Sequence, residues 1–409
     1  MEATSKTEKT SFIKIIFFGN FPFGGPSANL VRNFAMSLTE NKNNQLEIIL
    51  PTGNCYGKTD DIESKRKAKF GSVNYRYMSY KNHPKNIFAK IFEMFFGVLN
   101  TLIYLIICRI KERKNITIFY NTEFSFPFLL LSKLLNNKFI FILPEFYEKP
   151  NSDNYAMSGF KWKIFYFHMK HIIKYADRFF VASYYLKDYI QNTLKSKKEV
   201  YVLPNVIDPS IFELENIKPF KENIITIGYT GNPTRKDGIL DLIKSFSILN
   251  KKFPNTHLLV IGDRTNGESL VPQLLQYATE NGSEKNITFT GLVAFSKIPE
   301  LLNSCQILAL TRPNGVFAEA GFPTKLGEYF SCKKPVLITK VGDIPRYFTN
   351  HEQVVLADPE NIESIVKGFE AIITDNALSN RLGLSGYKWM NDNLNYLNIS
   401  KKISDFISA

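Results

Sequence analysis

Short hydrophobic runs rich in β-branched residues alternate along the chain with longer segments in which apolar residues recur at helical spacing. This alternation is typical of doubly wound parallel sheets, in which helices connect neighbouring strands. In the first half we expect strands at 13–18, 46–50, 116–120, 139–143, 179–182 and 200–203. In the second half we expect them at 224–229, 257–261, 287–290, 307–309 and 335–338. The pattern predicts two α/β domains.

The alternation restarts after residues 203–209, where Pro204 and Pro209 interrupt regular structure. We therefore place a linker near Val206, with a first domain at 1–205 and a second at 206–390. A last helix near 395–408 is expected to return to the first domain, so residues 391–409 form a third segment. In such a protein a ligand is expected in a cleft lined by the carboxyl ends of both sheets.

The chain is basic, with 51 Lys and Arg against 38 Asp and Glu and a formal charge of +13. This charge favours an anionic partner without choosing among nucleic acid, acidic lipid and a phosphorylated small molecule. The cysteines and histidines show neither a C-x-x-C pair nor a metal-ligand spacing, which indicates a reducing compartment. The polar start, residues 1–10, does not resemble a signal peptide, so we expect a cytoplasmic protein. The cysteines are Cys55, Cys108, Cys305 and Cys332, and the histidines are His83, His168, His171, His257 and His351.

Two segments raise the question of a membrane. Residues 90–109 are largely apolar and approach the length that spans a bilayer, but they contain Glu93 and Asn100 and have no second span beside them. We interpret them as a buried helix of the sheet layer, with membrane contact as the alternative. Residues 160–175 mix aromatic side chains with lysines, which suits either peripheral contact with an anionic membrane or a packed helix with a basic solvent face.

The most informative motif is the run Gly-Phe-Pro-Thr-Lys-Leu-Gly-Glu-Tyr-Phe at 321–330. A proline-containing loop enters a helix here, so we expect Thr324 to be the N-cap and the N–H groups of the first turn to be available to a phosphate. Glu328 lies one turn further on and could accept hydrogen bonds from ribose hydroxyls. The alternative interpretation is a capped helix with a solvated glutamate.

This motif, followed by Lys-Pro-Val at 334–336, resembles the donor-binding signature of GT-B retaining glycosyltransferases of the family 4 type, the glycosyl transferases group 1, in a subgroup with an F-P-T-K-L motif. Residues 202–208 resemble the family's P-N-G-V-D segment, with Val206 in place of the glycine. Other similar segments follow in the family's order at 177–186, 227–231, 259–263 and 289–293. The resemblance implies two Rossmann-like domains facing each other across a cleft, with the acceptor in the first and a nucleotide sugar in the second.

The resemblance also implies a set of donor-binding residues. Many relatives carry two glutamates separated by seven residues, and the position that would pair with Glu328 is Ala320. Either Glu319 substitutes for that carboxylate or the carboxylate is missing. The donor-binding residues implied are Gly24, Gly25, Gly231, Val293, Phe322, Pro323, Thr324, Lys325, Leu326 and Glu328.

Arg235 and Lys236 are candidate catalytic residues, because they lie in the turn where the resemblance places the diphosphate. A cation there would stabilise the charge on the departing diphosphate. The family's lysine directly precedes a glycine, whereas here Asp237 intervenes, so Arg235 and Lys236 share the assignment. A solvated surface turn is the alternative interpretation.

Glu145 and Glu148 follow a first-domain strand in an E-x-x-E-x-P element and could orient the acceptor hydroxyl or take its proton. We favour Glu148 slightly, and the alternative is that both carboxylates fix a loop. The turn at 19–27, which includes Gly24 and Gly25, allows close approach of a ligand, with Ser27 expected to cap the next helix.

The resemblance implies a hexosyltransferase. We expect it to need no metal ion, because the chain contains no D-x-D motif and therefore lacks the usual metal ligands. It would need no cofactor besides its nucleotide-sugar substrate. As the resemblance implies, it would transfer a sugar to a hydroxyl of a glycan or lipid-linked acceptor, with retention, in bacterial surface polysaccharide biosynthesis.

Three other functions compete with this interpretation. A non-catalytic nucleotide-sugar sensor remains open because of Ala320. A nucleic-acid-binding protein is disfavoured because the chain has no recognisable reader pattern, and a dehydrogenase because the G-x-G-x-x-G spacing is absent.

Overall fold

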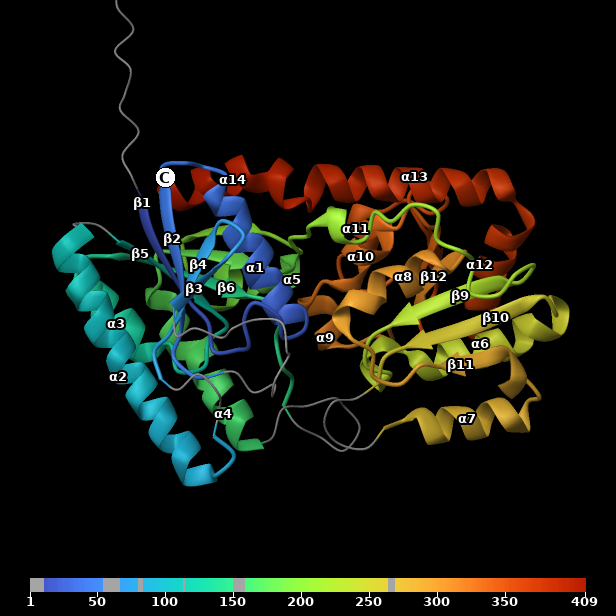
Figure 1. The fold of residues 1–409 in the computed structure, drawn as a ribbon, viewed down its shortest axis with the longest axis horizontal. Coiled ribbons are helices and arrows are strands. Elements are labelled where there is room, and N and C mark those ends of the chain that lie inside the picture. Colours follow the sequence, from blue (N-terminus) through green and yellow to red (C-terminus); the bar gives the residue numbers. More distant parts are fainter. Residues whose placement is uncertain (1–10, 54–66, 80–83, 113–114, 150–158, 264–268) are drawn as a thin grey trace, which may run out of the picture. The chain divides into compact units, whose positions relative to one another are not determined.

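The computed structural model describes residues 11–53, 67–79, 84–112, 115–149, 159–263 and 269–409 (Figure 1). Cys55, His83 and Pro150 lie outside the described residues. The chain divides into two compact units, of which the first comprises Met1–Glu145, Met157–Ile207 and Tyr396–Ala409. The second comprises Phe146–Ala156 and Asp208–Asn395. Each unit contains one sheet with helices around it.

The first unit is built on an eight-stranded sheet in the order β3-β4-β2-β1-β5-β6-β7-β8. All neighbouring strands are parallel except the antiparallel pair β3–β4. The six strands expected from the sequence are confirmed, whereas β3 and β4 at one edge were not predicted. The strands are β1 (Ser11–Ile16), β2 (Asn44–Leu50), β3 (Lys67–Phe70), β4 (Val73–Tyr77), β5 (Asn115–Tyr120), β6 (Lys138–Leu143), β7 (Arg178–Val181) and β8 (Glu199–Val202).

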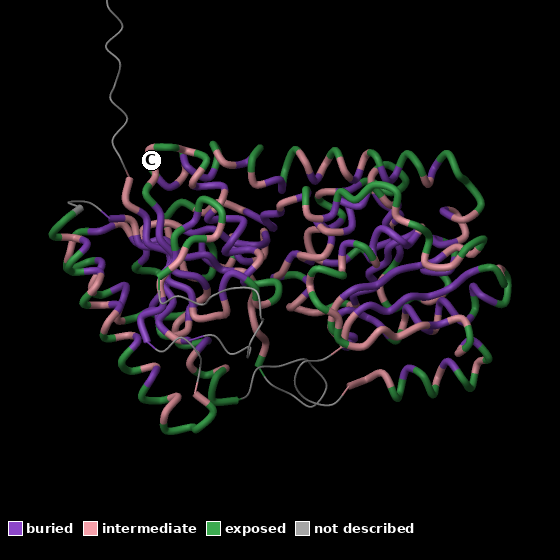
Figure 2. The backbone as a smooth tube through the Cα atoms, viewed as in Figure 1, coloured by how far each residue is buried: buried purple, intermediate pink, exposed green. Residues whose placement is uncertain are grey.

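Helices cover both faces of this sheet. On one face, α1 (Pro26–Thr39) and the last helix, α14 (Tyr396–Ser408), lie side by side over a core that includes Ile13 and Ile15 of β1. On the other face, aromatic side chains of β5, β6 and β7 pack on one another and on α3 (Phe126–Leu134). Alternate residues of a strand point to opposite faces, so each buried strand supplies both cores. Figure 2 shows that the strands are the most buried part of the unit.

Helix α2 (Ile87–Glu112) differs from the expectation for residues 90–109. It is one continuous helix of 26 residues, but it is not buried. Large apolar side chains are exposed along its whole length, including Phe88 at 78% and Ile110 at 76%. The prediction of a core helix is therefore wrong. Among the described residues, α2 is the one helix that is long and apolar enough to cross a membrane by length and composition.

Residues 160–175 form three short helical turns rather than one regular helix. These are α4 (Gly159–Phe167), the π-helical η1 (His168–Ile172) and the 3₁₀ turn η2 (Ile173–Tyr175). Phe165, Met169, Ile172 and Ile173 are buried, and the lysines are exposed, as are Phe160 and Phe167. The segment is thus anchored in the unit with a mixed basic and aromatic outer side. The first unit also contains α5 (Tyr184–Asp188) and η3 (Tyr189–Thr193).

The second unit has a fully parallel six-stranded sheet in the order β11-β10-β9-β12-β13-β14. The five expected strands are confirmed, and β14 was not predicted. The strands are β9 (Ile225–Thr230), β10 (Thr256–Ile261), β11 (Ile287–Phe289), β12 (Ile307–Leu310), β13 (Val336–Thr339) and β14 (Val355–Ala357). With the first sheet, this establishes the predicted class of two doubly wound α/β domains.

Helices connect the strands of the second sheet. Helices α6 and α12 pack against each other, and α13 packs on α10 and α12. The α-helices are α6 (Ile239–Lys252), α7 (Val271–Glu280), α8 (Ile298–Asn303), α9 (Val316–Ala320), α10 (Lys325–Ser331), α11 (Ile344–Tyr347), α12 (Ile362–Thr374) and α13 (Asn376–Asn393). Short 3₁₀ turns are η4 (Pro209–Ile211), η5 (Arg235–Asp237), η6 (Glu284–Asn286) and η7 (Phe295–Lys297).

Candidate functional site

The topology of the second sheet selects one position on its carboxyl edge. Strand β9 lies between β10 and β12, so the chain leaves β9 toward one side of the sheet and later returns to β12 on the other side. Loops diverge at such a switch point, and open α/β sheets bind ligands there. The loops that follow β9 and β12 contain Gly231, Arg235 and Lys236 of the predicted site, together with Asp237 and Arg312.

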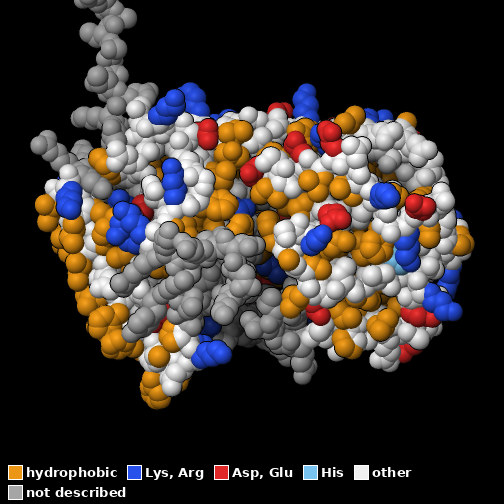
Figure 3. Space-filling view, in the orientation of Figure 1, with side chains coloured by type: hydrophobic (Ala, Val, Ile, Leu, Met, Phe, Trp, Pro, Cys, Tyr) orange, Lys and Arg blue, Asp and Glu red, His pale blue; other side chains and the backbone are white. Residues whose placement is uncertain are grey.

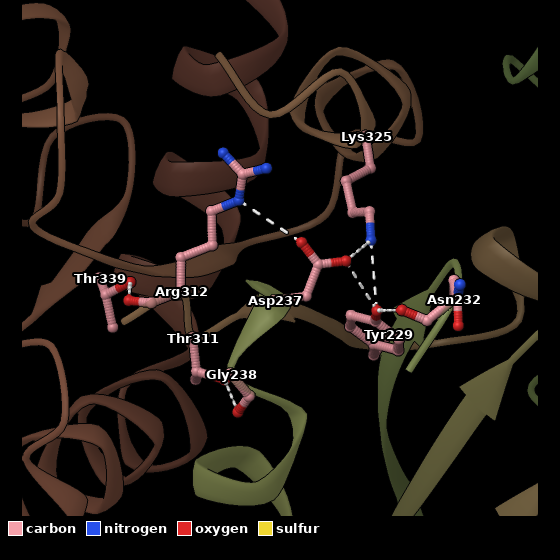
Figure 4. A network of polar contacts seen from close by, with 8 residues as sticks. All are labelled: Tyr229, Asn232, Asp237, Gly238, Thr311, Arg312, Lys325 and Thr339. Carbon is pink, nitrogen blue, oxygen red and sulfur yellow. Dashed lines mark hydrogen bonds and ion pairs between the residues drawn. The ribbon is translucent and has the colours of Figure 1, made fainter. Parts of the chain in front are cut away.

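A charged network occupies this switch point (Figure 4). Lys325, the first residue of α10, places its Nζ 2.5 Å from Oδ2 of Asp237 in η5 and donates a hydrogen bond of 3.3 Å to the Tyr229 hydroxyl. Arg312, which follows β12, places Nε 3.4 Å from the other carboxylate oxygen of Asp237. The Tyr229 hydroxyl lies 2.9 Å from Asp237 Oδ2 and 2.8 Å from the carbonyl oxygen of Asn232. Four segments of the chain therefore meet at Asp237.

The network contains two cations and one carboxylate in a nearly closed space. The side chains of Lys325 and Asp237 are 16% and 12% exposed. Burial by itself would raise the pKa of Asp237, but the charges of Lys325 and Arg312 outweigh it and hold the pKa well below its usual range. Asp237 is therefore ionised at neutral pH. The group as a whole carries a net positive charge, because Lys325 and Arg312 face a single carboxylate. Nη1 of Arg312 is buried and has no hydrogen-bond partner within the described residues.

Lys325 lies against the backbone of the loop after β9. Gly231 has a φ of +125°, and a Cβ atom at this position would collide with Nζ of Lys325. The ammonium lies 4.5 Å from the centre of the Tyr229 ring. An ammonium has three N–H donors, and Asp237 and Tyr229 accept two of them within the described residues. The third donor is therefore available to an anion at the carboxyl edge.

Arg235 and Lys236 precede Asp237 in η5 and therefore lie beside this network. Arg235 is exposed and Lys236 is half-buried, whereas Asp237 is buried. The sequence did single out Lys325 as a donor-binding residue, but it did not pair Lys325 with Asp237 or include Arg312. One signal was present, because Asp237 occupies the position directly before Gly238 where the resemblance expects a lysine.

The motif that contains Lys325 has two kinds of residues. Phe322, Pro323 and Leu326 are buried, and Phe322 stacks near Trp389 of α13, so these residues fix the start of α10 in the core. Glu328 is half-buried. Thr324 is the N-cap residue of α10, as predicted, but its backbone angles are helical and its side chain makes no capping hydrogen bond. Val293 is half-buried in the loop after β11.

The first unit gathers several predicted residues at its own switch point, between β1 and β5. Gly24 and Gly25 follow β1, and α1 begins at Pro26 with Gly25 in the cap position. The prediction that Ser27 caps this helix is therefore wrong. Burial raises the pKa of the Tyr120 phenol at the end of β5, while a hydrogen bond from Ser27 lowers it and the charge of Glu145 raises it further. Glu145 is thus within electrostatic reach of Tyr120 at the carboxyl edge of the sheet.

A second carboxyl group, that of Glu123, belongs to this neighbourhood of Glu145. Burial raises the pKa of Glu123, a shift that the charge of Lys161 opposes and that of Glu145 increases. Three predicted residues of the first unit, Gly24, Gly25 and Glu145, therefore lie along one carboxyl edge beside an additional acid.

Glu148 and the Ala320 position both involve α9. Oε1 of Glu148 accepts a hydrogen bond of 3.3 Å from the backbone N–H of Val316, the first residue of α9. At the other end of α9, Ala320 is fully buried and Glu319 is exposed. Glu319 is thus turned to solvent, whereas the place of Ala320 is buried, so Glu319 does not supply a carboxylate at the Ala320 position. Among the described residues, no group of three or more His, Cys, Asp or Glu is placed to hold a metal ion.

Solved structures with a similar arrangement place this geometry in a known fold. Sucrose-phosphate synthase from Thermosynechococcus elongatus matches with a TM-score of 0.71 and 13% identity, over 97% of this chain and 98% of that chain. HepE from Anabaena, solved in complex with UDP, matches with a TM-score of 0.69 and 15% identity, over 97% and 99%. Both units together therefore have the GT-B fold of glycosyltransferases.

Sequence comparisons agree for the second unit. Residues 210–389 match the family model described as "Glycosyl transferases group 1". The capsular polysaccharide biosynthesis glycosyltransferase CapM of Staphylococcus aureus is 25% identical over 57% of this chain and 62% of its own length. A phosphatidylinositol N-acetylglucosaminyltransferase component from Arabidopsis thaliana is 25% identical over 44% and 37%. The chain thus spans about a third to three fifths of the length of these relatives.

Proposed function

We propose that this protein is a glycosyltransferase that moves a hexose-type sugar from a nucleotide-sugar donor to a hydroxyl group of a glycan or lipid-linked acceptor. The observation that carries the proposal is the cationic network around Lys325 at the switch point of the second sheet, within the segment that matches the group 1 model. A diphosphate is the part of such a donor that this network fits best, since it is anionic and has oxygens to accept the third N–H of Lys325.

The chemistry follows from where charge develops. In transfer, the bond between the anomeric carbon and the diphosphate oxygen breaks, and the electron pair stays on the diphosphate. The acceptor oxygen bonds to the anomeric carbon and loses its proton. A fixed cation beside the leaving diphosphate lowers the barrier electrostatically. We assign this role to Lys325, with Asp237 and Tyr229 holding its ammonium in place, and keep Arg235 and Lys236 as contributors at the edge of the loop.

The remaining assignments stay as the sequence made them. Glu328 is proposed to bind the ribose hydroxyls, and Glu145 or Glu148 to orient the acceptor or take its proton. Glu148 already accepts a hydrogen bond from α9, which supports a structural contribution as well. Retention of configuration and a role in bacterial surface polysaccharide synthesis are part of the proposal. The name of the CapM relative supports a polysaccharide as the product, and the UDP complex of HepE supports a nucleotide sugar as the donor.

We also propose that the enzyme works in the cytoplasm without a metal ion. The cysteines in the described residues, Cys108, Cys305 and Cys332, are buried and form no disulfide with one another, as expected in a reducing compartment. Burial raises the pKa of the Cys305 thiol to about 12, which makes it unreactive. Metal independence is tested by measuring transfer with and without EDTA.

Calorimetric titration with UDP, GDP, ADP and CMP tests the donor site. We expect one nucleotide to bind, and Lys325→Met to weaken its binding about tenfold or more, since a charged hydrogen bond contributes about 1.5–3 kcal/mol. Glu328→Ala and Lys236→Ala complete the set. Lys252→Met is the matched control, because Lys252 forms an exposed ion pair with Glu370 at the far end of α6. If none of the nucleotides binds the wild-type protein, the proposal is wrong.

A non-catalytic nucleotide-sugar sensor is the second candidate, and the buried Ala320 favours it. The two functions differ in turnover. A transferase releases free nucleoside diphosphate from the bound donor when acceptor is added, and slowly by hydrolysis without it. A sensor binds the donor with the same dependence on Lys325 and releases none. Measuring nucleotide release at saturating donor decides between them.

A further inference from the structure

Helix α2 has the reverse of the polarity expected for a helix packed on a sheet. Its inward side consists of Glu93, Gly97, Thr101, Leu105 and Cys108, all buried and spaced three or four residues apart. A helix of a water-soluble domain normally turns its apolar side to the core and its polar side outward. Here the inward side includes Glu93, Gly97 and Thr101, whereas the large apolar residues are mostly on the outer side, which therefore requires a different environment.

The outer side is a continuous apolar stripe. It runs from Ile87 to Ile110, which at 1.5 Å per residue is about 35 Å long. The exposed residues of the stripe are Ile87, Phe88, Ile91, Phe92, Phe95, Phe96, Leu99, Ile103, Ile106, Ile107 and Ile110. Hydrophobic side chains are visible in Figure 3 along the edge of the first unit where Figure 1 places α2. An apolar surface of this length is far larger than scattered exposed side chains would give.

The neighbouring helix α3 extends this apolar surface. It packs against α2 and exposes Phe126, Leu130 and Leu134, which are spaced four residues apart and therefore lie on one side of the helix. The apolar surface thus has width as well as length.

Polar contacts along the length of α2 hold its inner side against the first unit. Glu93, with no exposed surface, accepts hydrogen bonds from the backbone N–H of Gly53 at 2.7 Å and from the Ser79 hydroxyl at 3.1 Å. Near the middle, Asn100 donates to the carbonyl oxygen of Met78 at 2.9 Å. A Cβ atom on Gly97 would collide with the carbonyl oxygen of Pro51, so the helix lies directly on the end of β2.

The second half of α2 is fastened in the same way. The Tyr104 hydroxyl donates to Glu47 at 2.6 Å, and Arg109 Nε donates to the carbonyl oxygen of Leu135 at 2.8 Å. Glu47 also pairs with Arg76 at 3.0 Å. Moving α2 out of the protein and across a bilayer would leave Glu93 and these partners without hydrogen bonds, at a cost of several kcal/mol in hydrocarbon. The helix therefore stays on its unit.

We propose that α2 lies in the plane of a membrane surface, with its apolar stripe inserted into the boundary between the headgroups and acyl chains of anionic phospholipids. Charge supports this occupant. Lys85 and Lys90 lie at one end of the stripe, and Arg109 and Lys111 lie at the other. Among the described side chains between the two ends of the stripe the single acid is Glu93, which faces inward. Basic ends on an apolar helix of this kind match an anionic interface.

A second copy of this chain fits the stripe less well. An antiparallel pairing of two α2 helices would bring the basic end of one helix beside the basic end of the other, because both ends carry lysine. Anionic headgroups along both ends remove this conflict. The apolar stripe is also uninterrupted by a polar residue that would set the register of a protein partner.

Vesicle flotation of the full-length protein in about 0.15 M NaCl tests the proposal. The stripe variant Phe88→Ser/Phe95→Ser/Ile106→Ser replaces three exposed side chains. Its matched control, Ile248→Ser/Leu275→Ser/Leu384→Ser, replaces three exposed apolar residues of the second unit. We expect wild type and control to bind vesicles that contain phosphatidylglycerol, and the stripe variant to bind at least about tenfold more weakly. Equal binding by the stripe variant, or no binding by the wild type, overturns the proposal.

Two further measurements keep the test decisive. Circular dichroism checks that the stripe variant is folded. If it is not, the charge reversal Lys85→Glu/Lys111→Glu replaces it and is expected to lower binding to anionic vesicles but not to phosphatidylcholine vesicles. Light scattering in solution tests whether a second copy of the chain covers the stripe. If the wild type is a dimer that the stripe substitutions dissociate, and it does not bind vesicles, the membrane proposal is wrong.

Orientation is tested with single cysteines on bound protein. An in-plane helix leaves both Lys85→Cys and Lys111→Cys open to a membrane-impermeant maleimide added outside the vesicles, whereas a spanning helix shields one of them. None of these measurements requires donor or acceptor. The membrane proposal can therefore fail while the transfer reaction stands, and nucleotide binding can fail while vesicle binding stands.

Discussion

Replacing Lys325 by methionine removes the cation that directly contacts Asp237 and keeps most of the side-chain volume. Removing one member of a buried ion pair costs about 3–5 kcal/mol. Arg312 remains 3.4 Å from the other oxygen of Asp237 and the Tyr229 hydroxyl remains at 2.9 Å, so we expect a loss of about 3 kcal/mol in the free energy of unfolding. Asp237→Asn leaves two buried cations without their carboxylate, and we expect a loss of about 4 kcal/mol.

The double variant reports the coupling of the pair. Because Lys325 and Asp237 interact directly, the double variant should be more stable than the sum of the single losses predicts, by about 2 kcal/mol. Urea unfolding of the second unit can be followed by Trp389, whose ring packs 4.5 Å from that of Phe348 in the same unit. A Trp162→Phe background removes the signal from the first unit.

Nucleotide affinity separates this prediction from a general loss of structure. Lys325→Met should weaken binding about tenfold or more, because it removes the donor to the diphosphate. Asp237→Asn should bind at least as tightly as the wild type, because the competing carboxylate is gone while Lys325 remains. Stability falls in both variants, but affinity falls only with Lys325→Met. If both variants lose affinity in proportion to their loss of stability, Lys325 has a structural role and the assignment to the diphosphate is refuted.

Three other perturbations have defined outcomes. Gly231→Ala should weaken nucleotide binding about tenfold in calorimetry, because its Cβ displaces Lys325, whereas Gly282→Ala, also at positive φ but in open space, should cost only about 1 kcal/mol in urea unfolding without affecting affinity. Burial and the charge of Lys221 lower the pKa of His257 to about 4. Below the ordinary pKa of 6.5, His257 takes up a proton in the unfolded chain but not in the folded chain. The free energy of unfolding of the second unit should therefore fall by about 2 kcal/mol between about pH 6.5 and about pH 4.5. In urea unfolding, His257→Gln should flatten this pH dependence. EDTA should leave the transfer rate within about twofold, and a loss restored by Mg²⁺ would contradict the metal-independent mechanism.

The central strands could be predicted because they are buried on both faces. In β10 all six residues, Thr256–Ile261, are buried, and such a strand reads as one hydrophobic run. The edge strands do not have this signal. β4 alternates buried and exposed residues, and β3 reads Lys-Ala-Lys-Phe, with no hydrophobic run at all. Their pairing depends on each other and on β2, which a local pattern does not contain.

The case of α2 shows why apolar content does not fix burial. Its residues predict a long apolar helix, and the helix is present. The sequence could not decide which side of α2 faces the protein, because that side is set by contacts with distant residues. Glu93 accepts from Ser79, which follows β4, and Tyr104 donates to Glu47 of β2. A charged residue inside an apolar run could signal either a membrane site or a buried anchor. In the structure Glu93 is a buried anchor, so the apolar side of α2 is exposed.

Asp237 and Lys325 illustrate the same limit at the site. Taken one motif at a time, Asp237 is a departure from the lysine that the family resemblance expects before Gly238, and Lys325 is one residue in a longer motif. The fold brings them within 2.5 Å, although 88 positions separate them in the chain. The positive charge is therefore still present at the loop after β9, but it is supplied by α10 and neutralised in part by the residue that stands in place of the lysine. A pair of this kind holds its ammonium at a fixed point. We therefore expect donor binding to be preserved although Asp237 stands in place of the family's lysine. The signature of this arrangement is an affinity that falls with Lys325→Met and not with Asp237→Asn, in which Tyr229 still contacts the ammonium.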